Sequence, residues 1–348
     1  MIQFVNPIDL GNTKVGDGMP CYVIAEIGGL FRNFDEAKRL IDTAKEIGVD
    51  SVKFQTLEAE TVTTKDNFFD MENTGHISQY ELLKDFEIPK DVQMEVVEYA
   101  NKLGMTIFSA PSHINDLEIM KKMELPIFKI GSDLACHIPL LKEIASLKKP
   151  IILSTGMCSM EEVRNSVDAI HSCGNDKLAI LHCVSNYPSK PEETNLNAII
   201  TMKNEFDVPV GLSDHCIGSS VVLGAAAMGA NLIEKHFRDE RNTPSPDDIV
   251  ALDKNQFSSL IKSIREIETA KGNGVKEPTK SEKKNMITNR VSIIILRDLA
   301  KGTILTEDMI DVRRPGTGLS PKFYDTVLGK KIKRDVKKEE PLTSEIIG

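Results

Sequence analysis

Eight short apolar runs, rich in β-branched residues, alternate with amphipathic helical stretches over the first 270 of the 348 residues of this chain. Each run is almost continuously apolar, as expected of a strand that is buried on both faces of a parallel sheet. The runs span residues 22–28, 50–55, 105–111, 127–132, 150–156, 178–185, 209–215 and 231–237. Eight successive strand–helix units predict a (β/α)8 barrel (TIM barrel), an α/β fold whose functional residues gather where the strands end.

The sequence changes character after residue 270. Residues 271–285 are polar and contain glycine and proline, which predicts a linker. Short strand patterns follow at 291–296, 301–305 and 330–335. We therefore expect a barrel domain over residues 1–270, a linker over 271–285 and a small β-rich domain over 286–348, near the lower size limit for independent folding.

Composition narrows the class of partner. A net charge of −9 makes nucleic acid and anionic membrane surfaces poor partners. No apolar run approaches the ~20 residues of a membrane span, and residues 1–7 lack the basic-then-apolar pattern of a signal peptide. The six cysteines show no paired spacing, which is typical of reduced thiols. We therefore expect a cytoplasmic protein that binds neither nucleic acid nor membrane.

Two histidines end neighbouring predicted strands. His215 closes the seventh run and His236 the eighth, and Glu234 shares the inward face of its strand with His236. Adjacent strand ends of a barrel meet at one mouth, so the two imidazoles predict a divalent-metal site. Only two protein ligands would leave positions open for substrate, as in a catalytic site. The alternative is that both histidines are hydrogen-bonded core residues.

Two lysines predict an anion site at the same mouth. Lys53 and Lys129 lie inside apolar strands, where an ammonium is costly unless it has a partner such as a phosphate or carboxylate. Ser132 and Ser154 add hydroxyls of the kind that bind phosphate oxygens. Lys235 faces away from Glu234 and is expected to be structural. The alternative is that the two inward lysines are salt-bridged parts of the scaffold.

Several motifs closely resemble the sialic acid synthases, the phosphoenolpyruvate-dependent N-acetylneuraminate synthases and their legionaminate and pseudaminate relatives. They are Ala-Glu-Ile-Gly at 25–28, Val-Lys-Phe-Gln at 52–55, Phe-Lys-Ile-Gly-Ser at 128–132, Leu-Ser-Thr-Gly-Met at 153–157, Leu-Ser-Asp-His at 212–215 and Glu-Lys-His-Phe at 234–237. The tail, with Arg-Arg-Pro-Gly-Thr-Gly-Leu at 313–319, resembles that family's antifreeze-like (SAF) domain. The resemblance covers essentially the whole chain.

This resemblance implies a nonulosonic acid synthase. A metal ion, Mn2+ or else Mg2+ or Co2+, would polarise the aldehyde of an open-chain N-acylated amino hexose, which the enol carbon of phosphoenolpyruvate attacks. Water addition and C–O cleavage would give a nine-carbon 2-keto sugar acid and phosphate. The implied catalytic residues are Glu26, Glu234, His215 and His236, of which His215 and His236 would bind the metal. The implied phosphoenolpyruvate-binding residues are Lys53, Lys129, Ser132, Ser154, Ser185 and Ser213. The implied sugar-binding residues are Gln55, Tyr187, Asp247 and Arg314, the last reaching the partner subunit's barrel in a homodimer with exchanged SAF domains.

The chain departs from the family pattern near the sugar. Leu30 and Phe31 replace an Asn-His pair, Ala110 stands where a Thr hydroxyl is usual, and Leu134 takes the place of an acidic residue. Lost partners for sugar hydroxyls would each cost about 1–3 kcal/mol if those hydroxyls were present. The departures therefore favour a less polar, deoxygenated or di-N-acylated acceptor, with Leu30 and Phe31 as its wall.

Two other functions remain open at this point. A pyruvate-type aldolase could use Lys53 or Lys129 as a Schiff-base nucleophile. A catalytically reduced, sugar-binding relative is the second alternative.

Overall fold

In the computed structural model, which describes residues 4–348, eight parallel strands close into a barrel. They are β3 (Tyr22–Glu26), β4 (Ser51–Thr56), β7 (Thr106–Pro111), β8 (Phe128–Ile130), β9 (Ile151–Ser154), β10 (Leu178–Cys183), β11 (Val210–Asp214) and β12 (Leu232–His236). Each overlaps one of the eight predicted runs, and β12 pairs with β3 to close the ring. The predicted TIM barrel is therefore confirmed. Met1, Ile2 and Gln3 of the N-terminal stretch considered above lie outside the described residues.

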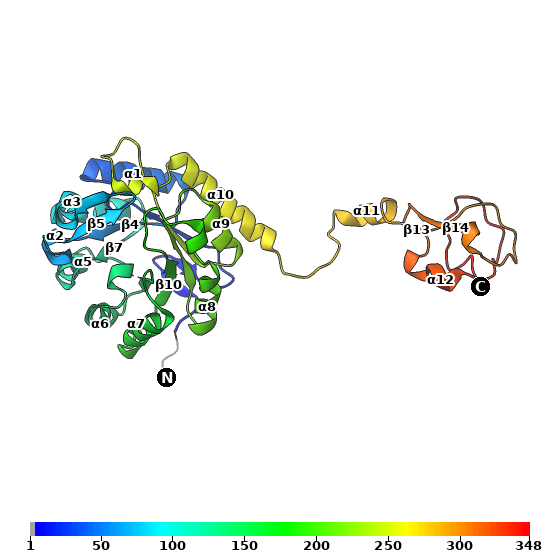
Figure 1. Ribbon diagram of the computed structural model, residues 1–348, viewed down its shortest axis with the longest axis horizontal. Coiled ribbons are helices and arrows are strands. Elements are labelled where there is room, and N and C mark those ends of the chain that lie inside the picture. Colours follow the sequence, from blue (N-terminus) through cyan, green and yellow to red (C-terminus); the bar gives the residue numbers. More distant parts are fainter. Residues whose placement is uncertain (1–3) are drawn as a thin grey trace. The chain divides into compact units, whose positions relative to one another are not determined.

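Helices surround this barrel on its outer side, as Figure 1 shows. They are α1 (Phe34–Ile47), α4 (Lys90–Lys102), α5 (Leu117–Lys122), α6 (Ile138–Ser146), α7 (Met160–Ser172), α8 (Asn197–Glu205), α9 (Ser220–Ala227) and α10 (Lys254–Lys271). In α1 the Asn33 side chain accepts a hydrogen bond from the Glu36 amide, and Gly48 ends the helix at a φ of 80°. Between these caps Leu40 and Ile41 are buried against the barrel.

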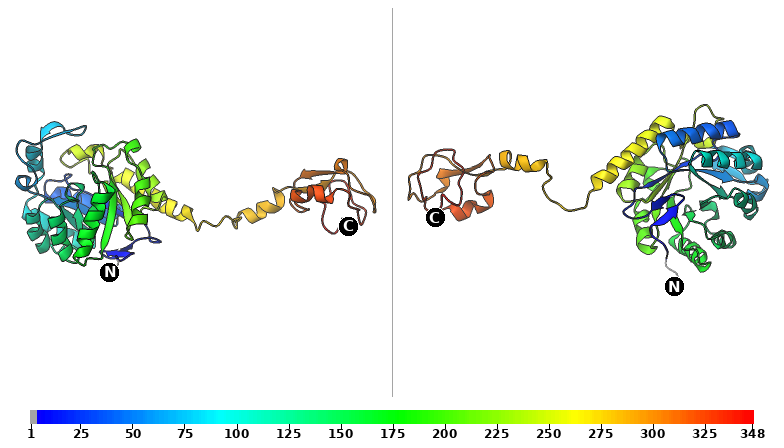
Figure 2. Two further views of the ribbon diagram at one scale, coloured as in Figure 1. Left: turned by 60° about the horizontal axis from the view of Figure 1, so that its bottom comes forward. Right: turned by 180° about the vertical axis from the view of Figure 1, so that it is seen from behind.

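A small hairpin closes the N-terminal end of the barrel. Strands β1 (Ile8–Leu10) and β2 (Thr13–Val15) pair antiparallel, and Figure 2 shows this dark blue hairpin beside the barrel. The apolar side chains of the hairpin join one buried cluster with inward-facing barrel residues, among them Phe108 and Leu232. No sequence pattern predicted this hairpin. Because the hairpin covers the N-terminal end of the barrel, the C-terminal end of the strands is left open for a site.

A long segment between β4 and α4 has secondary structure of its own. It contains α2 (Ala59–Val62), β5 (Phe68–Met71), β6 (Gly75–Ser78) and α3 (Gln79–Phe86). The segment leaves the barrel at the C-terminal end of β4, so it lies at the end of the barrel where functional residues gather. Short 3₁₀ helices follow other strands; they are η1 (Ile114–Asp116), η2 (Ser132–Leu134), η3 (Pro191–Glu193) and η4 (Pro246–Ile249).

Contacts divide the chain into two units, Met1–Gly272 and Asn273–Gly348. The second unit contains α11 (Glu282–Thr288), β13 (Ser292–Ile295), η5 (Glu307–Met309), β14 (Ile310–Arg313), η6 (Pro321–Phe323) and α12 (Tyr324–Val327). Its own core includes Ile293, Leu305 and Leu342. The helix α11 begins inside the stretch expected to be a linker. The strand patterns at 301–305 and 330–335 form only isolated bridges, such as Ile304 with Lys331.

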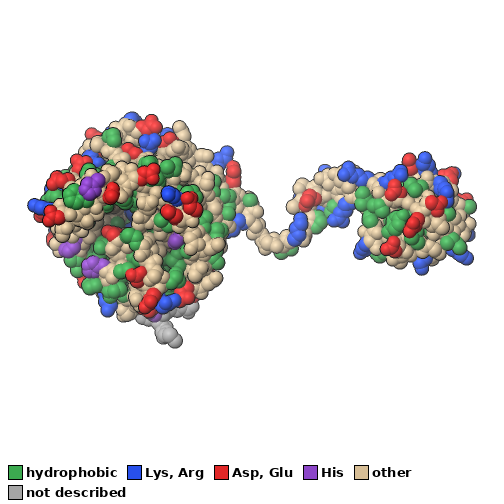
Figure 3. Space-filling view, in the orientation of Figure 1, with side chains coloured by type: hydrophobic (Ala, Val, Ile, Leu, Met, Phe, Trp, Pro, Cys, Tyr) green, Lys and Arg blue, Asp and Glu red, His purple; other side chains and the backbone are tan. Residues whose placement is uncertain are grey.

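The surface carries charges of both signs. Figure 3 shows acidic and basic side chains interspersed over the face in view. No helix within residues 4–348 is long and apolar enough to cross a membrane.

Candidate active site

A cavity of about 400 Å³ opens at the C-terminal ends of the barrel strands. It brings together every site residue predicted in the barrel: Glu26, Lys53, Gln55, Lys129, Ser132, Ser154, Ser185, Tyr187, Ser213, His215, Glu234, His236 and Asp247. The remaining predicted residue, Arg314, lies exposed in the second unit. The residues selected from sequence thus share one cavity, while their individual roles stay predictions.

Two ammonium groups and two carboxylates meet in the floor of this cavity, and all four side chains are buried. Lys53 pairs with Glu26, and its Nζ lies 3.4 Å from Glu234 Oε1. Lys129 Nζ lies 3.6 Å from the same Glu234 oxygen, to which Ser213 Oγ donates a hydrogen bond of 3.0 Å. Strands β3, β4, β8, β11 and β12 each contribute one residue, so the cluster depends on the closed barrel.

The cluster shifts the pKa values of its members. Burial lowers the pKa of Lys53 to about 8, against the opposing effect of Glu234. Burial also acts to raise the pKa of Glu234, but the charges of Lys129 and Lys53 outweigh it and bring the value to about 2. At neutral pH Glu234 is therefore ionised, and the ammonium of Lys53 is close to its titration range.

Hydroxyl groups gather beside the lysines. Lys129 Nζ donates a hydrogen bond of 2.6 Å to Ser154 Oγ, and the Gly156 amide donates one of 2.9 Å to Ser132 Oγ. A Cβ at Gly156 would collide with the hydroxyls of both Ser185 and Ser132. Glycine at this position therefore lets the two serine hydroxyls approach the backbone. A cationic group surrounded by hydroxyls suits the oxygens of a phosphate.

The two predicted metal ligands lie close together in the cavity. The ring centroids of His215 and His236 are 5.6 Å apart, and Tyr187 stacks on His215 at 4.0 Å. His215 Nδ1 lies 2.9 Å from the Val184 carbonyl oxygen, which fixes the ring. Such a carbonyl accepts a hydrogen bond from the protonated Nδ1, which leaves Nε2 with a lone pair, as in many metal-binding histidines.

Unsatisfied atoms test whether a metal would fit here. Within the described residues, His236 Nδ1 and Glu234 Oε2 are buried and have no hydrogen-bond partner. Burial and the charge of His215 hold the pKa of His236 well below its usual value, which favours the neutral ligand form. Among residues 4–348 no three His, Cys, Asp or Glu side chains converge as a complete ligand set. The unpaired Nδ1 of His236 and the oriented ring of His215 would suit an ion held by two imidazoles with its other positions open.

Asp247 closes the cavity beside the histidines. The 3₁₀ helix η4 presents its carboxylate, because the Ser245 side chain accepts a hydrogen bond from the Asp247 amide. Asp247 Oδ2 lies 3.9 Å from His236 Nδ1. Burial raises the pKa of Asp247 to about 6.

An apolar wall covers the outer part of the cavity, and most of it comes from the segment between β4 and α4. The wall residues are Phe31, Phe69, Met71, Leu82, Leu83, Phe86 and Ile88. Arg32 holds the wall in place, since its guanidinium lies 4.0 Å over the Phe86 ring and donates a hydrogen bond of 3.1 Å to the Gly29 carbonyl. Sequence reasoning predicted Phe31 as part of this wall but missed the contribution of the segment between β4 and α4, although Phe69, Leu82 and Leu83 stand out as apolar residues in an otherwise polar stretch.

The expected wall of Leu30 and Phe31 is wrong in one half. Both side chains are only 1 % exposed and belong to the same buried cluster, but Phe31 lines the cavity and Leu30 does not. Ala110 lines the cavity but lacks the hydroxyl that is usual at this position. Of the two neighbouring serines, Ser109 and Ser112, only Ser112 lines the cavity. The Ser109 hydroxyl is instead hydrogen-bonded to Thr56 and to the Phe54 carbonyl.

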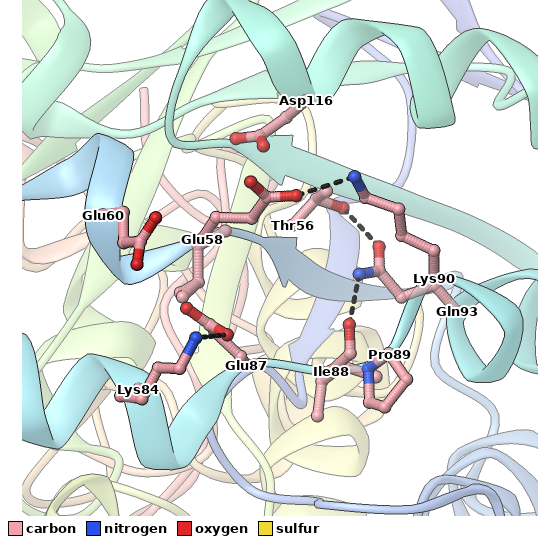
Figure 4. Close-up of a pocket in the computed structure, with 11 residues that line it drawn as sticks. Thr56, Glu58, Glu60, Lys84, Glu87, Ile88, Pro89, Lys90, Gln93 and Asp116 are labelled. Atoms are coloured by element: carbon pink, nitrogen blue, oxygen red, sulfur yellow. Dashed lines mark hydrogen bonds and ion pairs between the residues drawn. The ribbon is translucent and has the colours of Figure 1, made fainter.

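A second cavity of about 280 Å³ lies at the base of the same segment and shares Leu57 and Ile88 with the first. Figure 4 shows that both of its lysines pair with glutamates. Lys90 binds Glu58 and Lys84 binds Glu87, each at 2.7 Å. Gln93 donates to the Ile88 carbonyl and accepts from Thr56. Lys90 and Gln93 of α4 thus join the two ends of the segment to each other and to the end of β4.

Comparisons with known proteins agree with this architecture. The NeuB family matches residues 40–276, and the SAF domain matches residues 290–345. N,N'-diacetyllegionaminic acid synthase of Legionella pneumophila is 37% identical over 91% of this chain and 92% of its own length. Pseudaminic acid synthase of Helicobacter pylori is 33% identical over 94% and 98%. The crystal structure of N-acetylneuraminic acid (sialic acid) synthetase from Leptospira borgpetersenii, in complex with citrate, superposes with a TM-score of 0.71 at 30% identity, covering 82% of this chain and 97% of that one.

Proposed function

Because this chain belongs to the NeuB family and carries a SAF domain, we propose that it condenses phosphoenolpyruvate with an N-acylated amino hexose. The products are a nine-carbon 2-keto sugar acid and phosphate. The observation that carries the proposal is the single cavity in which Lys53, Lys129 and several serines lie beside His215 and His236. One half of the cavity is suited to a phosphorylated anion, and the other to a carbonyl group.

Phosphoenolpyruvate binds through the lysine–serine half. Lys129, held by Ser154, and Lys53 supply positive charge, while Ser132, Ser185 and Ser213 supply hydroxyls. Preorganised cationic and hydroxyl groups of this kind stabilise the negative charge of the departing phosphate. Glu26 and Glu234, now paired with the lysines, are the carboxylates nearest the reacting carbons, and ionised Glu234 can accept a proton from the attacking water.

The histidines would hold a divalent ion, which we propose to be Mn2+, with Mg2+ or Co2+ as substitutes. When bound, such an ion withdraws electron density from the aldehyde oxygen of the acceptor. His215 and His236 are buried and close together, and His215 is oriented by the Val184 carbonyl. Glu234 Oε2 and His236 Nδ1 are among the buried atoms of the described chain that have no hydrogen-bond partner, so they are available to a ligand.

The acceptor sugar lies against the apolar wall. Phe31, Phe86, Leu82 and their neighbours offer no hydrogen-bond partners, so a hydroxyl facing them would lose its hydrogen bonds to water. Gln55, Tyr187 and Asp247 line the polar remainder and are the proposed contacts to the sugar. A deoxygenated, di-N-acylated hexose meets both conditions, and synthases of diacetyllegionaminic and pseudaminic acid are among the relatives.

The proposal also covers the oligomeric state and the location of the protein. We propose a cytoplasmic homodimer in which Arg314 of each SAF domain reaches the acceptor in the partner's barrel. The exposure of Arg314 supports this role. Size-exclusion chromatography with light scattering tests the dimer, and Arg314→Ala should raise the KM of the acceptor sugar without changing that of phosphoenolpyruvate.

One observation favours an aldolase as a second candidate. The pKa of Lys53, lowered to about 8 by burial, suits a Schiff-base nucleophile. An aldolase would be trapped by borohydride with pyruvate and would be indifferent to EDTA. The synthase would not be trapped and would lose activity to EDTA.

Phosphate release from phosphoenolpyruvate in the presence of Mn2+ tests the main proposal. The panel of acceptors is N-acetylmannosamine, its 6-phosphate, mannose and the 2,4-diacetamido-trideoxyhexoses. We expect release with a 2,4-diacetamido-trideoxyhexose and not with mannose. Absence of release with every sugar, from folded protein loaded with Mn2+, contradicts the proposal and favours a sugar-binding relative that has lost catalysis.

A further inference from the structure

Two cysteines from separate turns lie close together at the C-terminal end of the barrel strands. Cys136 Sγ and Cys158 Sγ are 3.8 Å apart. Cys136 lies between η2 and α6, and Cys158 lies between β9 and α7, so the two turns follow the paired strands β8 and β9. The sequence shows no paired spacing of cysteines, because Cys136 and Cys158 come together only when adjacent strands of the barrel align.

The two sulfurs are placed for a disulfide. A disulfide bond is about 2.05 Å long, so the sulfurs need only a modest approach. Cys136 is exposed and Cys158 is partly exposed, so an oxidant in solvent can reach the pair. Because Cys136 is the more exposed of the two sulfurs, it is the one that meets the oxidant first.

The same two turns build part of the active cavity. Ser132 and Asp133 precede Cys136, and Ser154 and Met157 precede Cys158; all four line the cavity. The turns already touch at their bases, where the Gly156 amide donates a hydrogen bond to Ser132 Oγ. Movement of either cysteine backbone therefore displaces groups that face the proposed phosphate.

We propose that Cys136 and Cys158 form a reversible dithiol–disulfide site that a hydroperoxide closes, and that closure weakens binding of the phosphorylated substrate. The Cys136 sulfur attacks the peroxide and gives up its thiol proton to the leaving oxygen; the O–O bond breaks, and a sulfenic acid and an alcohol or water result. Cys158 then attacks the Cys136 sulfur, the S–O bond breaks, and water leaves with the released proton. In total, two thiols and one hydroperoxide give one disulfide, one water and one alcohol or second water.

Peptide mapping tests the site on the full-length protein. We expect sub-stoichiometric hydrogen peroxide to yield one cross-linked peptide containing Cys136 and Cys158, with the loss of two hydrogen atoms, and dithiothreitol to reverse it. Cys136→Ser and Cys158→Ser should abolish the cross-link. Cys173→Ser, which removes another partly exposed thiol, should leave it unchanged. Oxidation of Cys136 to sulfinic acid without a cross-link, or a cross-link to a different cysteine, overturns the proposal.

The coupling to the cavity rests on the proposed function and has a separate test. Phosphoenolpyruvate should bind the oxidised protein roughly 10- to 100-fold more weakly than the reduced protein, since displacements of about 1 Å have effects of that size. Hydrogen exchange of the amides in 131–136 and 154–158 should slow on oxidation, whether or not the substrate binds. Equal affinity and equal exchange in the two states overturn the coupling. Failure of the reduced protein to bind phosphoenolpyruvate would instead count against the proposed function.

Discussion

Lys235 Nζ donates a hydrogen bond of 2.6 Å to Asp214 Oδ2, and neither residue is more than 2 % exposed. Lys235 lies between Glu234 and His236 but on the opposite face of β12, and Asp214 directly precedes His215. The ion pair therefore joins the ends of β11 and β12 from outside the barrel. Its geometry agrees with the structural role expected for Lys235. The pair holds the ends of β11 and β12 in register, next to the two histidines.

Lys235→Met should destabilise the barrel strongly. The substitution leaves Asp214 as a buried charge without its partner, and breaking such a pair costs about 3–5 kcal/mol. The free energy of unfolding of the barrel, from urea denaturation, measures the effect. Lys254→Met provides a matched control, because it breaks the exposed pair with Glu46 at 2.6 Å, which solvent screens. Equal losses in the two variants would contradict the structural role of the buried pair.

His215→Ala should remove Mn2+ binding. The structure offers two imidazoles as ligands, so losing one should lower the affinity by more than the roughly 10–100-fold typical of losing an outer-shell partner. Titration followed by the electron paramagnetic resonance of free Mn2+ gives the dissociation constant without an activity assay. His76→Ala is the control, since His76 stacks on Phe68 outside the cavity. Unchanged Mn2+ binding in His215→Ala would place the ion elsewhere.

Phosphoenolpyruvate affinity should fall as the pH rises through 8. The ligand is an anion and needs the protonated form of Lys53, whose pKa burial lowers to about 8. Below that pH the affinity is nearly constant, and above it the affinity declines by up to about tenfold per pH unit. Calorimetric titration between pH 7 and about 9.5 measures the profile. Lys53→Met should bind more weakly at pH 7 and show no decline; a declining profile in that variant would assign the effect to another group.

Phe86→Ala should impair use of the acceptor sugar and spare phosphoenolpyruvate. Phe86 belongs to the apolar wall and packs under Arg32, so its removal opens the outer cavity. The KM of the sugar should rise roughly 10- to 100-fold. Phe68→Ala is the control on the same segment, because Phe68 is half-exposed and does not line the cavity. A rise in the KM of phosphoenolpyruvate instead of that of the sugar would assign Phe86 to the other half of the site.

The barrel and the polar part of the site could be predicted from sequence because both follow local rules. Continuous apolar runs mark buried parallel strands. Polar residues at the end of such a run, for example Lys53 and His236, must lie at the functional end of the barrel. The alternation of side chains along a strand placed Glu234 inside and Lys235 outside, and the structure agrees.

The remaining features depend on contacts between distant segments. Phe86 reaches the cavity only because the segment between β4 and α4 folds back over the barrel, and no local pattern encodes that path. Leu30 and Phe31 are neighbouring apolar residues in one buried cluster, yet only Phe31 also lines the cavity. The meeting of Cys136 and Cys158 likewise follows from the alignment of two strands.

The hairpin that closes the bottom of the barrel sets a constraint on how the chain can fold as it leaves the ribosome. Ile8 and Leu10, which are synthesised before any strand of the barrel, are buried against side chains such as Leu232, which emerge much later. The backbone amide of Cys21 similarly donates its hydrogen bond to Glu268, which is synthesised 247 residues later. Contacts of such long range slow folding. The hairpin can pair within itself early, but it cannot bury its apolar side chains against the barrel until nearly the whole barrel has been translated.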